Sequence, residues 1–416
     1  MATSEWRPAK LDQLGHVGRG RSRHRPRNAD FLYGGPYPFF QTGDIKAANY
    51  YLNDYSQTYS ESGLAQSKLW QPGTLCITIA ANIAESAILG IEGCFPDSVV
   101  GFVADPEKAD VRFVKYYLEI LKIRMQGISH GATQDNLSLD KLLTFDFLVP
   151  PLPIQRRIAG ILSAYDDLIE NSQRRIKILE EMARRLYREW FVHFRFPGHE
   201  DCLLVESPLG EIPEGWEVKA FTEIADVLSG GTPKTDVPQY WNGEIPFFTP
   251  RDAPDCFYLQ DTDKHVSDIG LSKCASALYP PDTVFITARG TVGKVALPAV
   301  NMAMNQSCYA LRGKTGIPQR FLCLMTLQQV DYLKTNTGEA TFDTIVVDTF
   351  RRMEVVSPSQ AIASQFSELI DPVFEQVNTL QRQIQNLRRT RDLLLPRLLS
   401  GQIDVEALPE PVLYEL

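Results

Sequence analysis

The amino-acid sequence predicts an α+β protein made of two mixed α/β modules in tandem, each followed by a long helix. Two observations predict this fold. The chain repeats itself at about half its length, and each half changes from short β-rich runs to one long amphipathic helix. We expect the two helices to pair as an antiparallel coiled coil with pseudo-two-fold symmetry.

The repeat becomes visible when the sequence is shifted against itself by 208 residues, half of its 416. Asp44 then coincides with Asp252 and Ile176 with Ile384, and a shift of one residue more aligns Thr78 with Thr287. Because nearly one offset serves five separated segments, chance is a poor explanation. The two halves therefore encode copies of one module.

The β-rich part of each half spans residues 31–103 and 245–310, where short β-branched and aromatic runs are broken by Gly and Pro. Such runs are typical of strands joined by loops. A proline-containing segment, 149–153 in the first half and 356–358 in the second, then ends each module. A long helix is predicted after each of them.

Both predicted helices carry apolar residues at alternating steps of three and four, interrupted by Ser172 in the first and Arg391 in the second. A stripe this narrow favours another helix as the partner over packing on the helix's own module. Pro372 is expected to kink the second helix or to mark where its straight part begins. The predicted seam comprises Ile158, Ile161, Tyr165, Leu168, Ile176, Leu179, Leu186, Phe366, Leu369, Val373, Val377, Leu380, Ile384, Leu387 and Leu394.

Antiparallel pairing would place the two modules at opposite ends of a stiff spacer, since about 40 helical residues extend roughly 60 Å. The predicted organisation is a first module at 1–150, a spacer helix at 151–195, a linker and second module at 196–356, a second spacer helix at 357–403 and an acidic tail at 404–416.

Composition excludes several classes of protein. The most apolar stretch, residues 75–91, contains Asn82 and Glu85, so no membrane-spanning helix is expected. The N-terminus lacks a secretory pattern, and we expect a cytoplasmic protein. Seven Cys without a Cys-x-x-Cys pair indicate reduced thiols and no zinc site. A net charge of −9 would ordinarily argue against nucleic acid as a ligand, although a total can hide local basic patches.

Catalytic motifs are not found. Residues 289–294 resemble a phosphate-binding loop, but Ala288 and Val295 stand where that motif needs Gly and Ser or Thr. No Gly-x-Gly-x-x-Gly follows a predicted strand, and no Asp/Asn-Pro-Pro-aromatic motif for amino methylation occurs. We therefore predict no catalytic residue, no metal site and no cofactor bound by this chain. Two duplicated modules without a reactive centre suggest binding.

The best binding signal is a run of five Arg within the nine residues 19–27, next to flexible Gly. Arg can reach phosphates and guanine edges, and amides suit adenine edges. A solvated cationic loop, or amides that serve turns, are the structural alternatives. The second half has different side chains at the equivalent places, as two readers of different sequences would need. The candidate DNA-binding residues are Arg19, Arg21, Arg23, Arg25, Arg27, Lys46, Asn82, Gln134, Asn136, Lys234, Thr235, Arg251, Arg289, Lys294, Asn305 and Gln306.

Four segments carry a family resemblance: residues 131–134 (Gly-Ala-Thr-Gln), 147–158, 281–294 and 393–403 with Leu-Pro-Arg-Leu-Leu-Ser-Gly. On these motifs the chain resembles, over essentially its whole length, the DNA specificity subunit of type I restriction-modification enzymes. The second half departs from the pattern: it lacks the Pro-Pro-Leu and the following Gln of the first half and has Ser357-Pro358-Ser359-Gln360. The Arg run at 19–27 is not a family motif.

The resemblance implies that each module is a target-recognition domain that reads one half of a bipartite, asymmetric site in double-stranded DNA. The helices would set the unread gap. Two methylation subunits would bring S-adenosylmethionine and methylate adenines, and restriction subunits would bring ATP and Mg for translocation and cleavage. Two other classes stay open: a self-contained DNA-modifying enzyme, and a coiled-coil scaffold that binds no DNA. Binding of S-adenosylmethionine by the isolated chain, or salt-dependent DNA binding, would separate them.

Overall fold

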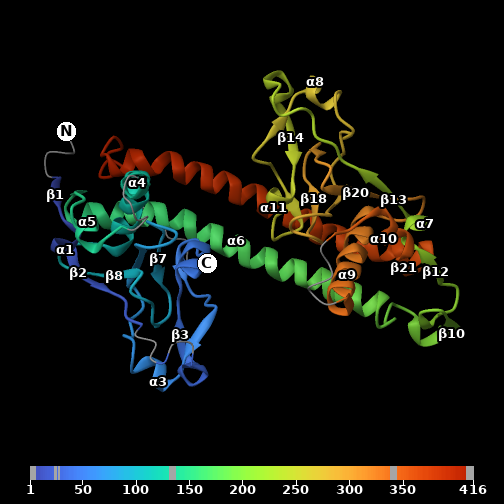
Figure 1. Cartoon of the computed structure of the whole chain (residues 1–416), viewed down its shortest axis with the longest axis horizontal. Coiled ribbons are helices and arrows are strands. Elements are labelled where there is room, and N and C mark those ends of the chain that lie inside the picture. Colours follow the sequence, from blue (N-terminus) through green and yellow to red (C-terminus); the bar gives the residue numbers. More distant parts are fainter. Residues whose placement is uncertain (1–5, 23–25, 27–28, 131–136, 338–343, 409–416) are drawn as a thin grey trace. The chain divides into compact units, whose positions relative to one another are not determined.

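The computed structural model describes residues 6–22, 26, 29–130, 137–337 and 344–408 (Figure 1). The chain divides into two compact units, which we call the first unit (residues 1–170 and 386–416) and the second unit (residues 171–385). Each unit combines one β-rich module with a part of both long helices.

The first unit is built on a five-stranded sheet with the order β2-β8-β6-β7-β4. The pairs are antiparallel except β4–β7, which is parallel. The strands of the whole first unit are β1 (Arg7–Ala9), β2 (Gly15–Arg19), β3 (Tyr33–Phe39), β4 (Tyr51–Leu52), β5 (Gln57–Tyr59), β6 (Leu75–Thr78), β7 (Ser86–Leu89), β8 (Val99–Ala104) and β9 (Phe147–Val149). Its shorter helices are α1 (Leu11–Leu14), η1 (Asp30–Leu32), α2 (Thr42–Ala47), α3 (Glu61–Leu64), α4 (Val111–His130) and α5 (Leu139–Leu142).

The second unit has the matching sheet, with the order β13-β20-β17-β18-β15. Its strands are β10 (Leu204–Ser207), β11 (Gly210–Pro213), β12 (Glu217–Ala220), β13 (Ala225–Ser229), β14 (Trp241–Phe248), β15 (Tyr258–Leu259), β16 (His265–Val266), β17 (Val284–Thr287), β18 (Val295–Pro298), β19 (Ala303–Met304), β20 (Cys308–Gly313) and β21 (Glu354–Ser357). Its shorter helices are η2 (His199–Asp201), α7 (Phe221–Ile224), η3 (Pro238–Tyr240), η4 (Pro250–Asp252), α8 (Asp268–Leu271), α9 (Gln319–Thr337) and α10 (Val347–Arg352).

The two sheets agree in register as well as in strand order. In the first, Ile77 pairs with Val100 and with Ser86. In the second, Ile286 pairs with Tyr309 and with Val295, each 209 residues further along the chain. A one-residue slip would turn every side chain to the opposite face of the sheet. The shared register therefore confirms that the sequence repeat is a structural repeat.

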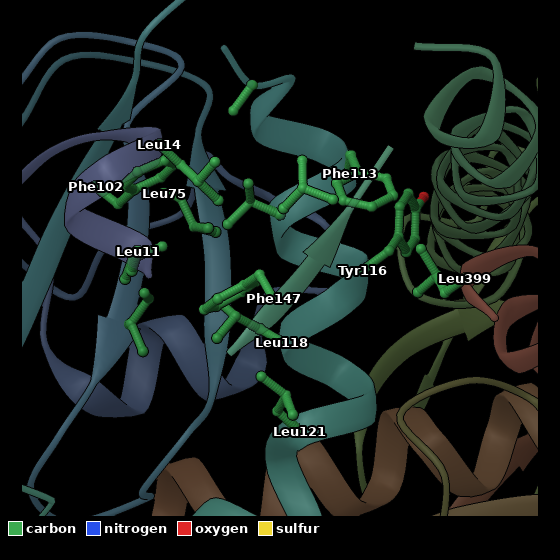
Figure 2. Packing of buried hydrophobic residues seen from close by; sticks show 14 of the residues in the cluster. Leu11, Leu14, Leu75, Phe102, Phe113, Tyr116, Leu118, Leu121, Phe147 and Leu399 are labelled. Atoms are coloured by element: carbon green, nitrogen blue, oxygen red, sulfur yellow. The ribbon is translucent and has the colours of Figure 1, made fainter. Parts of the chain in front are cut away.

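The core of the first unit lies between its five-stranded sheet and helix α4 (Figure 2). Leu75 and Phe102 from the sheet are fully buried, as is Phe113 from α4. Phe147 on β9 joins the same cluster, and Leu399 reaches it from the C-terminal end of the chain. Each such side chain contributes about 1.5–3 kcal/mol on burial.

Two helices of 40 residues each, α6 (Leu152–Phe191) and α11 (Gln360–Leu399), follow the modules. In the first unit, Ile158 near the start of α6 shares the core with Leu398 at the end of α11. In the second unit, the ring of Phe191 at the end of α6 lies 4.8 Å from the ring of Phe366 near the start of α11. The two helices thus run antiparallel, which confirms the predicted pairing.

The buried stripe of these helices departs from the predicted seam at two positions. Leu168 and Leu369 are 51% and 52% exposed, and the next residues, Ile169 and Ile370, are buried instead. The heptad assignment was wrong there because apolar side chains occupy both neighbouring positions, so spacing alone did not choose between them. Of the remaining positions, Ile158, Ile176, Phe366, Val377, Leu380 and Ile384 are buried, whereas Ile161, Tyr165, Leu179, Leu186, Val373, Leu387 and Leu394 are half-buried.

The interruptions of the pattern also find a place in the fold. Ser172 is buried within the stripe, and Arg391 is half-buried. Pro372 lies inside α11, which runs through it from Gln360 to Leu399.

Within the described part of the chain, no helix has the length and hydropathy that crossing a bilayer requires.

Candidate nucleic-acid interface

A buried threonine fixes the turn between β6 and β7 in the first unit (residues 79–85). The Thr78 hydroxyl donates a hydrogen bond to the Asn82 carbonyl and accepts one from the Glu85 backbone N–H at 3.0 Å. Thr78 itself has no exposed surface. Because the buried hydroxyl bonds to two backbone groups of the turn, it holds the turn's backbone at Asn82 and Glu85.

The second unit repeats this device between β17 and β18 (residues 288–294). The Thr287 hydroxyl donates to the Thr291 carbonyl and accepts from the Lys294 backbone N–H at 2.9 Å. Thr287 is as buried as its counterpart. The two turns therefore share one scaffold, while Ala80 in the first occupies the position of Arg289 in the second.

A carboxylate plays the equivalent part in a neighbouring loop of each unit. In the first unit, Asp44 accepts from the Gln41 backbone N–H at 2.7 Å. In the second, Asp252 accepts from the backbone N–H and the hydroxyl of Thr249 at 2.8 and 2.6 Å. These two carboxylates cap short helices, so they serve the loop rather than a ligand.

In the second unit, the loop and the turn border one open pocket of 530 Å³. Three of the predicted residues line it: Arg251, Arg289 and Asn305. Gly290 has φ +83°, and a Cβ built on it would lie 3.9 Å from the Cβ of Pro250, so turn and loop lie side by side. The sequence did not reveal this convergence, because the residues come from three separate segments.

A second pocket of the same unit, of 280 Å³, contains the predicted residue Thr235. Asp263 and Lys264 line both pockets and so join them. The Lys264 ammonium lies 5.8 Å from the centre of the Trp241 ring, which also borders the smaller pocket. Neither Lys264 nor Trp241 was predicted, since neither belongs to a motif or a charge run. We call the two joined pockets the second-unit groove.

The cations of this groove differ in whether their side chains have partners among the described residues. Arg251, Lys264 and Arg289 are all exposed. Among the residues that the structure describes, neither Arg251 nor Arg289 has an ion pair or a side-chain hydrogen bond. Asp252 is occupied by Thr249, as described above. The two guanidinium groups are thus available to an outside acceptor.

Other predicted residues of the second unit have partners within it. Lys294 forms an ion pair with Asp255. The Asn305 side-chain oxygen accepts from the Ser307 backbone N–H at 3.0 Å, which is a turn contact. Two further contacts are a hydrogen bond between Thr232 and the Gln306 carboxamide, and one from the Trp241 indole to the Lys234 carbonyl at 3.1 Å.

In the first unit, two of the described candidates, Arg19 and Arg21, lie at and just after the end of β2. Arg19 ends β2 and is exposed, as is Arg21, whose backbone N–H donates to the Phe95 carbonyl at 3.0 Å. Between them, Gly20 allows a close approach, since a Cβ there would meet the Pro96 carbonyl oxygen at 2.2 Å. This glycine fixes where the Arg run leaves the sheet.

Lys46 is exposed on α2, and Asn82 is half-buried in its turn. Five further candidates lie outside the described residues: Arg23, Arg25, Arg27, Gln134 and Asn136. Within the described ranges, no group of three or more His, Cys, Asp or Glu side chains is arranged to hold a metal ion.

The fold defines a protein with two copies of one module on a pair of antiparallel helices, and each copy carries a turn and a loop with its own side chains. A family model described as the type I restriction modification DNA specificity domain matches residues 3–181 and 213–389. The chain therefore belongs to the type I restriction-modification DNA specificity family. Membership in this family of specificity subunits implies a non-catalytic role and assembly with other subunits and DNA.

Similar proteins cover nearly the whole chain. The type I restriction enzyme MjaIX specificity subunit of Methanocaldococcus jannaschii is 26% identical, with 97% of this chain and 95% of the relative aligned. The HindI specificity subunit of Haemophilus influenzae is 23% identical over 96% of this chain and all of its own length (100%). A solved type I system S subunit from M. genitalium has the same fold, with a TM-score of 0.58, 16% identity and coverage of 94% and 96%.

Proposed function

We propose that each unit reads one half of a bipartite, asymmetric site in double-stranded DNA and that this chain directs adenine methylation by partner subunits. The observation that carries the proposal is the pair of turns pinned by Thr78 and Thr287, with identical anchoring and different side chains. Two turns with the same backbone anchoring and different side chains suit a protein that reads two different half-sites.

The partners would be two methylation subunits, which bind S-adenosylmethionine, and restriction subunits, which bind ATP and Mg. The unread gap between the half-sites would be set by α6 and α11. This chain would bind no cofactor itself. Its acidic total, a net charge of −9, is compatible with DNA binding when partner subunits supply phosphate contacts.

The test is methylome sequencing of a methylase-free host that expresses this chain together with its neighbouring methylation subunit. We expect methylated adenines in a single bipartite motif with a fixed gap. Expression of the methylation subunit without this chain is the control and should leave the motif unmodified. Methylation that needs no specificity chain would contradict the proposal.

The two other classes make different predictions for the purified chain and for the assembled complex. A self-contained enzyme would bind S-adenosylmethionine alone, which isothermal calorimetry would detect. A scaffold without DNA binding would show neither a steep salt dependence nor sequence preference when the assembled complex is titrated with DNA.

A further inference from the structure

The two units carry their cations at different places on the same scaffold. Arg251, Lys264 and Arg289 border the groove of the second unit. The strand register places Gln57 at the position of Lys264, because His265 pairs with Pro246 as Thr58 pairs with Pro38. The sequence repeat places Gly43 and Ala80 at the positions of Arg251 and Arg289. All three cationic positions of the second-unit groove are therefore uncharged in the first unit.

The groups in the 530 Å³ pocket match a particular base pair. A free guanidinium donates two parallel hydrogen bonds, and guanine is the base that presents two acceptors, O6 and N7, in the major groove. The carboxylate of Asp263 lines the same pocket, and a carboxylate accepts from the amino group of cytosine. Thymine and adenine offer no such pair of acceptors to an Arg. The pocket thus combines the donors and the acceptor that suit a G·C pair.

We propose that the second unit reads at least one G·C pair of its half-site through Arg251 and Arg289, with Lys264 on a neighbouring phosphate. This inference rests on the proposed function and adds the base class to it. The first unit, with Gly43 and Ala80 at these positions, reads its half-site through other residues.

The experiment uses the complete methylation complex with single Arg251→Gln and Arg289→Gln variants and the methylome of a methylase-free host. Each variant should lower methylation of sites with guanine at one position of one half-site by about 5- to 150-fold relative to other bases. Since Gln suits adenine, the preference should move towards A. The other half-site and the gap should stay as in the wild type.

Two controls accompany these variants. Arg312→Gln removes an exposed cation of the same unit that pairs with Asp226, away from the groove lining, and should leave the motif unchanged. Lys264→Gln should weaken DNA binding evenly across sequences and lower the salt slope by about one. A base-specific effect of Lys264→Gln would overturn the phosphate assignment.

An unchanged guanine requirement in both Arg variants, or a half-site without any G·C pair, would overturn the proposal while the proposed function stands. If a variant abolishes methylation, the purified complex is bound to a library randomised in that half-site. Retained guanine preference there overturns the proposal, and lost preference supports it. Absence of a bipartite motif with the wild-type chain would refute the proposed function instead.

Discussion

The guanidinium of Arg391 on α11 forms an ion pair with the carboxylate of Asp166 on α6, within the first unit. The same carboxylate accepts a hydrogen bond from the Tyr116 hydroxyl on α4. Asp166 is only 4% exposed. One buried acid thus ties both long helices to the recognition module of that unit.

Removing Asp166 should destabilise this unit because half-buried Arg391 loses its buried partner and the Tyr116 hydroxyl loses its acceptor. We expect Asp166→Ala to lower the free energy of unfolding by about 3 kcal/mol, measured by urea denaturation; this is the lower end for a broken buried pair because Arg391 keeps Asp392 as a partner. The Asp166→Leu/Arg391→Met double variant should recover most of that loss, since apolar replacement of a buried pair is often neutral. Additive losses in the double-mutant cycle would contradict this account.

Glu180 on α6 should make stability depend on pH. Burial raises the pKa of Glu180, and the Phe257 backbone N–H at 2.5 Å and Arg184 oppose that rise. A carboxyl whose folded pKa is raised stabilises the fold fully below its unfolded pKa, about 4.5, and loses this contribution as pH rises through the folded value. Glu180→Gln should therefore flatten the decline in unfolding free energy as pH rises above about 4.5. Parallel pH curves for wild type and variant would refute this assignment.

The turn anchors should affect the two half-sites separately. Thr287→Val keeps the shape of the side chain but leaves the Thr291 carbonyl and the Lys294 N–H without the hydroxyl. We expect a loss of about 1–3 kcal/mol in stability and weaker discrimination in one half-site of the methylated motif. Thr78→Val is the matched control and should degrade the other half-site. Identical motif changes in both variants would be inconsistent with separate readers.

The spacer role of the helices can be tested by length. Inserting seven residues into α6 after Leu179 adds two helical turns, about 10 Å. Methylome sequencing should show a changed gap or no methylation, with the half-site sequences retained. Altered half-sites with an unchanged gap would count against the spacer role of the two helices.

Modularity gives a further expectation. Exchanging residues 211–356 for the matching segment of another family member should alter one half-site and leave the other. The exchanged segment contains the whole five-stranded sheet of the second unit, so the graft brings its own sheet. Methylation changed in both halves would show that the units do not read independently.

Much of the fold could be predicted because the sequence contains two copies of one module. The coincidence of Thr78 with Thr287 foreshadowed two sheets with one register, and the steps of three and four foreshadowed the long helices. The seam was predicted less well near Leu168, since an apolar pair such as Leu168-Ile169 satisfies two neighbouring stripes and only tertiary packing decides between them.

The candidate interface was harder to predict. Arg251, Arg289 and Asn305 could be chosen as polar residues at loop positions, but their meeting in one pocket depends on strand order. Lys264 carries no signal in the sequence, because a lone Lys before a short strand is common on any surface. The DNA-binding roles of all these residues stay predictions until the variants above are measured.

The buried hydroxyls of Thr78 and Thr287 have a consequence for how such a protein can change its target. Because a buried hydroxyl holds the backbone of each turn, the residue that stabilises the turn is not the residue whose side chain faces solvent. Arg289 is exposed, whereas Ala80 is half-buried. A substitution at Arg289 therefore meets solvent rather than core, and the recognised sequence can change there without repacking of the interior.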